Sequence, residues 1–93
     1  EEFAVILPET AIAGAMTVAE RMRQAIEALR IPHPSNPGGV VTASFGVASG
    51  VAMPETDPRQ IVKMADRALY HAKHAGRNCV HVLHSLDEGD AKE

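Results

Sequence analysis

Ninety-three residues suffice for one small domain, and 45% apolar against 23% charged residues is the balance of a folded globular chain. The net charge of −3 arises in the stretch 87–93, so the remaining residues are neutral overall and form no basic face for a nucleic-acid backbone. Cys79 is the single cysteine, which excludes an internal disulfide and favours a reducing, cytoplasmic location; the apolar runs are too short to span a bilayer.

The first predicted element is a strand over residues 3–7. Its sequence, FAVIL, is a continuous apolar run ended by Pro8, which is typical of a strand buried on both faces. Glu1 and Glu2 directly precede it. Carboxylates at the end of a strand can be a frayed terminus or half of a metal site, and the local sequence leaves both interpretations open.

Residues 11–30 predict a helix with Thr10 as its N-cap. Arg23 and Glu27, one turn apart, are expected to face solvent. The apolar face recurs at steps of three and four residues, at Ile12, Met16, Ala19, Met22, Ile26 and Leu29.

A loop over residues 31–39 is predicted by three prolines and two glycines. Gly38 and Gly39 indicate a turn, since no lysine and no following helix supports a phosphate-binding loop. The alternation over residues 41–47 then predicts a second strand, in which Gly46 permits a bulge or a close backbone approach.

A second helix is predicted over residues 58–75, with Asp57 as N-cap, Pro58 in the first turn and Gly76 at the C′ position. Its apolar stripe comprises Ile61, Met64, Ala65, Ala68, Leu69 and Ala72. Residues 79–83, CVHVL, predict a final strand. The order β-α-β-α-β predicts an α/β domain with helices packed on a sheet.

Lys73 and Arg77, at the end of the second helix, are the first candidates for binding a ligand. Two cations at this spacing could hold a polyphosphate. They could equally offset the negative end of the helix dipole, and the spacing alone does not decide between these roles.

Metal and nucleophile chemistry has weaker support. His71 and His74 could meet on one helix face, but nothing obvious completes a tetrahedral site, and surface histidines are the preferred interpretation. His81 and His84 would point to opposite faces of a strand. Cys79 has no designated base and is interpreted as a small buried hydrophobic residue.

Three stretches taken together, "EEFAVILPET", "VTASFGVASG" and "ADRALYHAKHAGRN", resemble the C-terminal part of a GGDEF domain, the diguanylate cyclase module of bacterial signalling. EEF would end a GGEEF signature. The resemblance assigns residues 1–83 to this domain and leaves 84–93 as an acidic tail that is expected to be disordered.

The resemblance implies a nucleotidyl-cyclase-like, palm-like sheet with packed helices, an α+β sandwich. It also implies a nucleotidyltransferase that condenses two GTP molecules into cyclic di-GMP and two pyrophosphates across a homodimer. The implied cofactor is Mg²⁺ or Mn²⁺, and an upstream sensory or regulatory domain is the implied partner. Neither a nucleic acid nor a membrane is expected to contact this segment.

Each matching position inherits a role from the resemblance. Glu1 would bind the metal and help deprotonate the attacking hydroxyl. Glu2 and Phe3 complete the signature, with the aromatic ring anchoring the strand. Lys73 and Arg77 would hold the GTP phosphates.

Arg21, on the first helix, matches a basic residue that helps bind product at an inhibitory site in some members. The signature glycines, the upstream strand with the other metal-binding acid, the guanine-reading Asn and Asp, and the RxxD inhibitory motif are not among the 93 residues. We therefore expect this chain alone to be inactive. The alternative function is a degenerate GGDEF module that binds GTP or cyclic di-GMP and regulates a neighbouring domain without catalysis.

Overall fold

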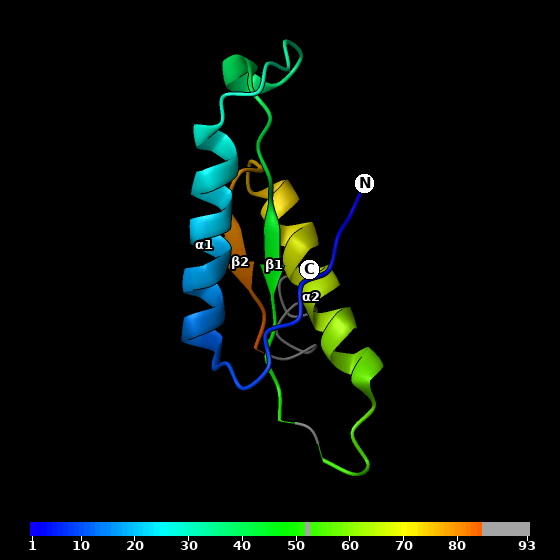
Figure 1. Cartoon of the computed structure of the whole chain (residues 1–93). Helices are drawn as coiled ribbons and strands as arrows, with labels where there is room; N and C mark the ends of the chain where they lie inside the picture. The colour runs from blue at the N-terminus through cyan, green and yellow to red at the C-terminus, as the bar shows by residue number, and fades with distance from the viewer. Residues whose placement is uncertain (52, 85–93) are drawn as a thin grey trace.

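The computed structural model describes residues 1–51 and 53–84 and shows two helices with two short strands between them (Figure 1). The elements, in chain order, are α1 (Ile12–Ala28), the 3-10 turn η1 (Pro37–Gly39), β1 (Phe45–Val47), α2 (Pro58–His74) and β2 (Val80–Val82). β1 and β2 are parallel, and α2 is the crossover that a parallel pair requires. The predicted α/β class is confirmed.

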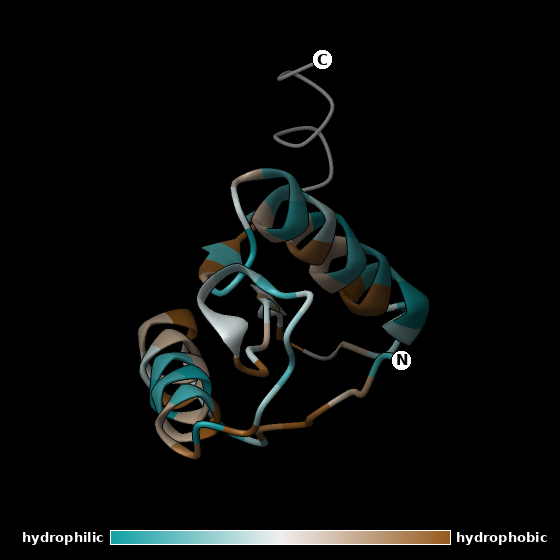
Figure 2. Ribbon diagram, turned by 90° about the horizontal axis from the view of Figure 1, so that it is seen from above, coloured by the Kyte–Doolittle hydropathy of each residue, from teal (hydrophilic) through white to brown (hydrophobic). Residues whose placement is uncertain are grey.

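The two helices cover opposite faces of this small sheet, as the view from above shows (Figure 2). Side chains alternate along each strand, so the residues on the α1 face are separated by residues on the α2 face. The strand residues on the α1 face pack against Ala15 and Ala19 of the helix. They are Phe45, Val47, Val80 and Val82.

Gly46 lies on the other face, directly against α2. A Cβ at this position would stand 2.2 Å from the carbonyl oxygen of Ala65 and 2.2 Å from the backbone nitrogen of Leu69, so only glycine fits. Of the two possibilities that the sequence left open at Gly46, a bulge or a close backbone approach, the structure shows the close approach. Ala68 and Ala72, which are completely buried, continue this contact with small side chains.

The ends of α2 follow the predicted signals. The Asp57 side chain accepts a hydrogen bond from the backbone N–H of Arg59 at 3.0 Å, and Pro58 occupies the first turn. At the other end Gly76 has φ +119°, and the N–H of Arg77 donates to the carbonyl of Ala72 at 3.0 Å. This is a Schellman C-terminus.

α1 is present, but two details of the prediction are wrong. Its N-cap is Ala11, because the hydroxyl of Thr10 donates to the carbonyl of Pro8 and does not reach the helix. The buried face centres on Ala15 and Ala19, whose small side chains allow the helix to approach the sheet. Met16 is therefore exposed on the flank, and Leu29 is exposed because α1 ends before it.

Residues 3–7 do not form the predicted strand, which leaves the order α-β-α-β. Neither described strand pairs with this segment, and an extended segment without a partner gains no ladder hydrogen bonds. Phe3 and Ile6 are 88% and 86% exposed, so Phe3 does not anchor a strand here; only Leu7 packs against the core. The segment runs alongside α2 (Figure 1).

Two further predictions concern the rest of the chain. Gly38 and Gly39 have φ of +80° and +74°, which confirms the predicted turn. From residue 85 onward, the predicted acidic tail lies outside the residues that the structure describes. Within the described ranges, neither helix has the length and apolar character needed to cross a membrane.

Candidate functional site

The acidic start of the chain lies at the basic end of α2. The ammonium Nζ of Lys73 is 3.0 Å from Oε2 of Glu2, and both side chains remain partly exposed. Glu1, which precedes Glu2 in the chain, is exposed. The structure thus brings together the acidic start of the chain and the helix-end cation, which the sequence alone could only place on separate elements.

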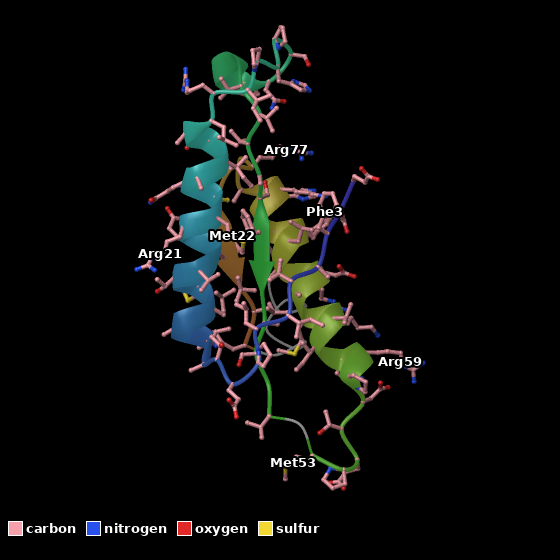
Figure 3. The ribbon with its side chains drawn as sticks, viewed as in Figure 1. Phe3, Arg21, Met22, Met53, Arg59 and Arg77 are labelled. Atoms are coloured by element: carbon pink, nitrogen blue, oxygen red, sulfur yellow. The ribbon has the colours of Figure 1, made fainter. Side chains whose placement is uncertain are left out.

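Arg77 belongs to the same end of the molecule but not to the helix. The backbone leaves α2 at Gly76, so the position of Arg77 is set by this turn rather than by the helical spacing to Lys73. Its side chain is exposed and projects from the loop (Figure 3). Among residues 1–51 and 53–84 it has no hydrogen-bond or ion-pair partner, which leaves the guanidinium available for an anion.

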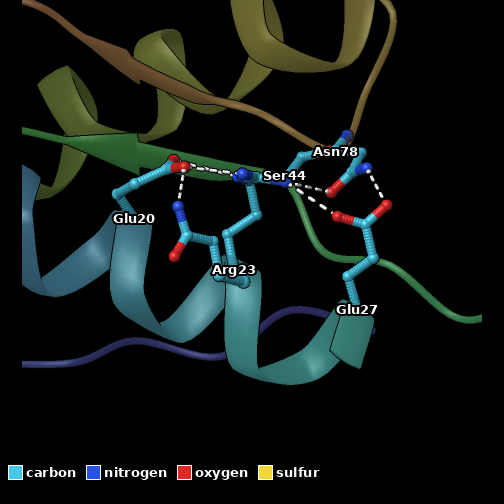
Figure 4. Close-up of polar contacts among 6 residues, drawn as sticks. Glu20, Arg23, Glu27, Ser44 and Asn78 are labelled. Carbon is cyan, nitrogen blue, oxygen red and sulfur yellow. Dashed lines mark hydrogen bonds and ion pairs between the residues drawn. The ribbon is translucent and has the colours of Figure 1, made fainter. Parts of the chain in front are cut away.

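A polar network around Asn78, the residue after Arg77, joins this loop to α1 (Figure 4). Arg23 donates to Glu20 at 2.9 Å, to Glu27 at 3.1 Å and to the side-chain oxygen of Asn78 at 3.0 Å. The prediction that Arg23 faces solvent is wrong: its side chain is only 16% exposed, because its partners hold it against the loop.

Charge pairing in this network shifts two pKa values. Hydrogen bonds from Arg23, and secondarily from Gln24, lower the pKa of the Glu20 carboxyl to about 2. The same pairing raises the pKa of the Arg23 guanidinium. The acids at three and four residues from Arg23 were the available signal in the sequence, but the contact with Asn78 had none.

The histidines of α2 pack around an aromatic ring. His74 lies 3.9 Å from Tyr70 between ring centroids and its Nδ1 is 2.9 Å from the Tyr70 carbonyl oxygen, while His71 meets the same ring edge-on. In the part of the chain that the structure describes, no group of three or more His, Cys, Asp or Glu side chains could hold a metal ion.

Two other residues considered in the sequence analysis do not add to this site, Arg21 because it lies far from this end of α2 and Cys79 because its thiol is hydrogen-bonded. Arg21 is exposed on the outer side of α1, across the sheet from α2 (Figure 3). It is therefore not part of the site at Lys73. Cys79 is partly buried, and its thiol donates to the Ala72 carbonyl at 3.4 Å.

The donor set at the start of the chain fits a hard divalent cation only in part. Glu1 and Glu2 supply carboxylate oxygens, which Mg²⁺ prefers, and Glu2 is already paired with Lys73. Mg²⁺ commonly binds through one or two carboxylates, substrate phosphates and waters. Glu1 alone meets that minimum on the protein side.

The family of the chain is shown by comparison. Residues 1–79 match the family described as diguanylate cyclase, GGDEF domain. The chain belongs to this family. The resemblance stated from the sequence is therefore confirmed, and the sheet and helices described above are those of part of a GGDEF domain.

Curated relatives give the same result. The response regulator PleD of Caulobacter vibrioides is 39% identical over 82 residues, which cover 86% of this chain and 18% of PleD. Diguanylate cyclase A of Treponema denticola is 42% identical over 80 residues, 86% of this chain and 21% of that protein. Diguanylate cyclase VdcA of Vibrio cholerae is 39% identical over 83 residues, 86% of this chain and 24% of its own length. The GGDEF chain thus spans about a fifth of these relatives.

Proposed function

We propose that this GGDEF chain is part of a diguanylate cyclase that condenses two GTP molecules into cyclic di-GMP and releases two pyrophosphates. The observation that carries the proposal is the family match over residues 1–79, which includes Glu1, Lys73 and Arg77. The placement of Lys73 beside the acidic start of the chain supports it, because phosphoryl transfer needs metal-binding acids next to phosphate-binding cations.

In this proposal the triphosphate is bound by the two cations. Lys73 acts as a point charge and Arg77 offers a planar fork to phosphate oxygens. Glu2 pairs with Lys73 in the described structure and competes weakly with a polyanion, since both side chains are partly exposed to solvent. The more highly charged triphosphate replaces it.

Glu1 carries the remaining protein role in the chemistry. It would hold Mg²⁺ or Mn²⁺, which neutralises phosphate charge when bound. Its carboxylate also accepts the proton of the attacking 3′-hydroxyl. The oxygen of that hydroxyl forms a bond to the α-phosphorus of the other GTP, while the bond between this phosphorus and the pyrophosphate oxygen breaks. A second displacement of the same kind, with the roles of the two GTP molecules exchanged, closes the ring.

Closing that ring takes two bound GTP molecules, one on each half of a homodimer. We therefore propose a cytoplasmic homodimer whose assembly is controlled by an upstream sensory or regulatory domain.

The test is to incubate the full-length protein that carries these residues with GTP and Mg²⁺ and to separate the products by chromatography. We expect cyclic di-GMP, and we expect Glu1→Gln to abolish turnover while GTP binding persists. GTP or cyclic di-GMP binding without turnover would instead establish the regulatory alternative. Absence of binding to either nucleotide would contradict both.

The 93 residues by themselves are expected to make no cyclic di-GMP. The family resemblance places guanine recognition and a second metal-binding acid in residues that this chain does not include. Product formed by the purified 93-residue chain, free of host cyclase, would contradict this expectation.

A further inference from the structure

Asn78 uses both polar groups of its side chain to bind α1. Its Oδ1 accepts from Arg23 Nη1 at 3.0 Å, and its Nδ2 donates to Oε2 of Glu27 at 3.0 Å (Figure 4). Its backbone N–H donates to the hydroxyl of Ser44, also at 3.0 Å. One residue is therefore fixed from two separate segments of the chain, and the carboxamide is held in one orientation.

The backbone at this point has an uncommon conformation. Gly76, Arg77 and Asn78 have φ of +119°, +63° and +49° in succession. Non-glycine residues rarely adopt the left-handed region, and such a stretch persists only where its surroundings hold it. The bond from the Arg77 N–H to the Ala72 carbonyl holds one end, and the three contacts of Asn78 hold the other.

Arg77 lies between these two fixed points, and its own side chain has no hydrogen-bond or ion-pair partner in the described ranges. The backbone therefore sets where the Arg77 Cα–Cβ bond leaves the loop and which region its guanidinium can reach, and that backbone is held by Asn78. We propose that Asn78 is a positioning residue that, through Arg23 and Glu27, orients Arg77 toward the nucleotide phosphates. This inference rests on the proposed function of Arg77.

A purely structural role for Asn78 makes a different prediction. If the network only joined α1 to the end of α2, its loss would lower stability and leave the nucleotide affinity of the folded protein unchanged. The experiment therefore measures GTP affinity under conditions where circular dichroism shows every variant to be fully folded.

Asn78→Asp is the sharpest change. Aspartate also tolerates the left-handed region and can still accept from Arg23, but its second oxygen then faces the Glu27 carboxylate. Adding Glu27→Gln restores complementarity, because the glutamine amide donates to Asp while its oxygen accepts from Arg23. The double variant has the same net charge as the wild type.

In the full-length protein we expect Asn78→Asp to weaken GTP binding at least about fivefold, and the double variant to return to within about twofold of wild type. In an Arg77→Ala background, Asn78→Asp should have no further effect, because its action passes through Arg77. Asn36→Asp, in the loop before β1, is the matched control for added charge; its amide donates to the Val40 carbonyl instead.

Two results would overturn the inference alone: Arg77→Ala weakens binding while Asn78→Asp does not, or Asn78→Asp is equally harmful in both backgrounds. Unchanged GTP affinity in Arg77→Ala itself would instead overturn the proposed phosphate contact, and the inference with it.

Discussion

Glu2 and Lys73, 71 positions apart in the sequence, form an ion pair with 3.0 Å between Oε2 and Nζ. Lys73 lies in the last turn of α2, where the helix dipole favours a cation. This ion pair therefore attaches the start of the chain, which pairs with neither β1 nor β2, to a helix end that already favours positive charge. Because both side chains are partly exposed, water and salt screen the attraction.

Replacing Glu2 with glutamine should change stability by less than about 1 kcal/mol, since exposed ion pairs contribute little. GTP affinity of the full-length protein should stay the same or rise, because Lys73 loses a competitor. Lys73→Ala should instead weaken GTP binding. Thermal melts and calorimetric titration of both variants check this, and a large loss of affinity in Glu2→Gln would contradict it.

Arg77→Ala distinguishes a phosphate contact from a helix-dipole effect. Loss of a charge-assisted hydrogen bond removes about 1.5–3 kcal/mol, so GTP affinity in the full-length protein should fall about 10- to 100-fold. The melting temperature should hardly change, because the Arg77 side chain is exposed beyond the helix.

Arg59→Ala is the control for removing an exposed positive charge from α2 at its opposite end. Arg59 is 89% exposed, in the first turn of α2, and pairs with Asp57. It should leave GTP affinity unchanged. If Arg77→Ala lowered the melting temperature and kept its affinity, the dipole interpretation would stand.

Gly46→Ala should be strongly destabilising. The added methyl group would meet backbone atoms of Ala65 and Leu69 at 2.2 Å, and backbone cannot rotate away as a side chain can. A cost of about 1–3 kcal/mol or more is expected. Gly14→Ala, whose methyl would meet only Cγ2 of Thr10 at 3.2 Å, should stay within about 1 kcal/mol of wild type. Equal urea midpoints for the two variants would refute the close approach.

Stability should decline in acid through Glu20. Hydrogen bonds from Arg23 hold the folded-state pKa of Glu20 at about 2, against 4.5 for the free group. A depressed carboxyl pKa contributes stability that is complete above about pH 4.5 and is lost as the pH falls toward 2. Urea unfolding at pH 6 and pH 3 should show a smaller decline for Glu20→Gln than for wild type. Identical declines would contradict the assignment.

The parts of the fold that could be predicted are those specified by neighbouring residues. Asp57, Pro58 and Gly76 define α2 by local capping, and each acts within a few residues of its own position. Gly46 indicated either a bulge or a close backbone approach, because a glycine inside a strand pattern is typical of both, and the structure shows the close approach.

The parts that could not be predicted depend on distant residues. A run such as FAVIL specifies a strand only where a partner pairs with it, and neither β1 nor β2 does. Arg23 looked solvent-facing because its contact with Asn78 spans 55 positions of sequence. The roles of Glu1, Lys73 and Arg77 came from family resemblance, since spacing alone could not separate a phosphate contact from a helix-dipole effect.

The exposed start of the chain makes a final prediction about assembly. Phe3 and Ile6 are 88% and 86% exposed, and the extended backbone around them has no strand partner among the described elements. Burying such side chains yields about 1.5–3 kcal/mol each, and unpaired extended segments also seek hydrogen-bond partners. We expect the 93-residue chain to form dimers or larger species at high micromolar concentration, by exchange of this segment between copies.

Phe3→Ser combined with Ile6→Ser should shift light scattering toward the monomer mass of 9.9 kDa. Val62→Ser, which removes an exposed apolar side chain from α2, should leave association intact. A wild-type chain that scatters as a monomer throughout this range would show that the exposed segment drives no association.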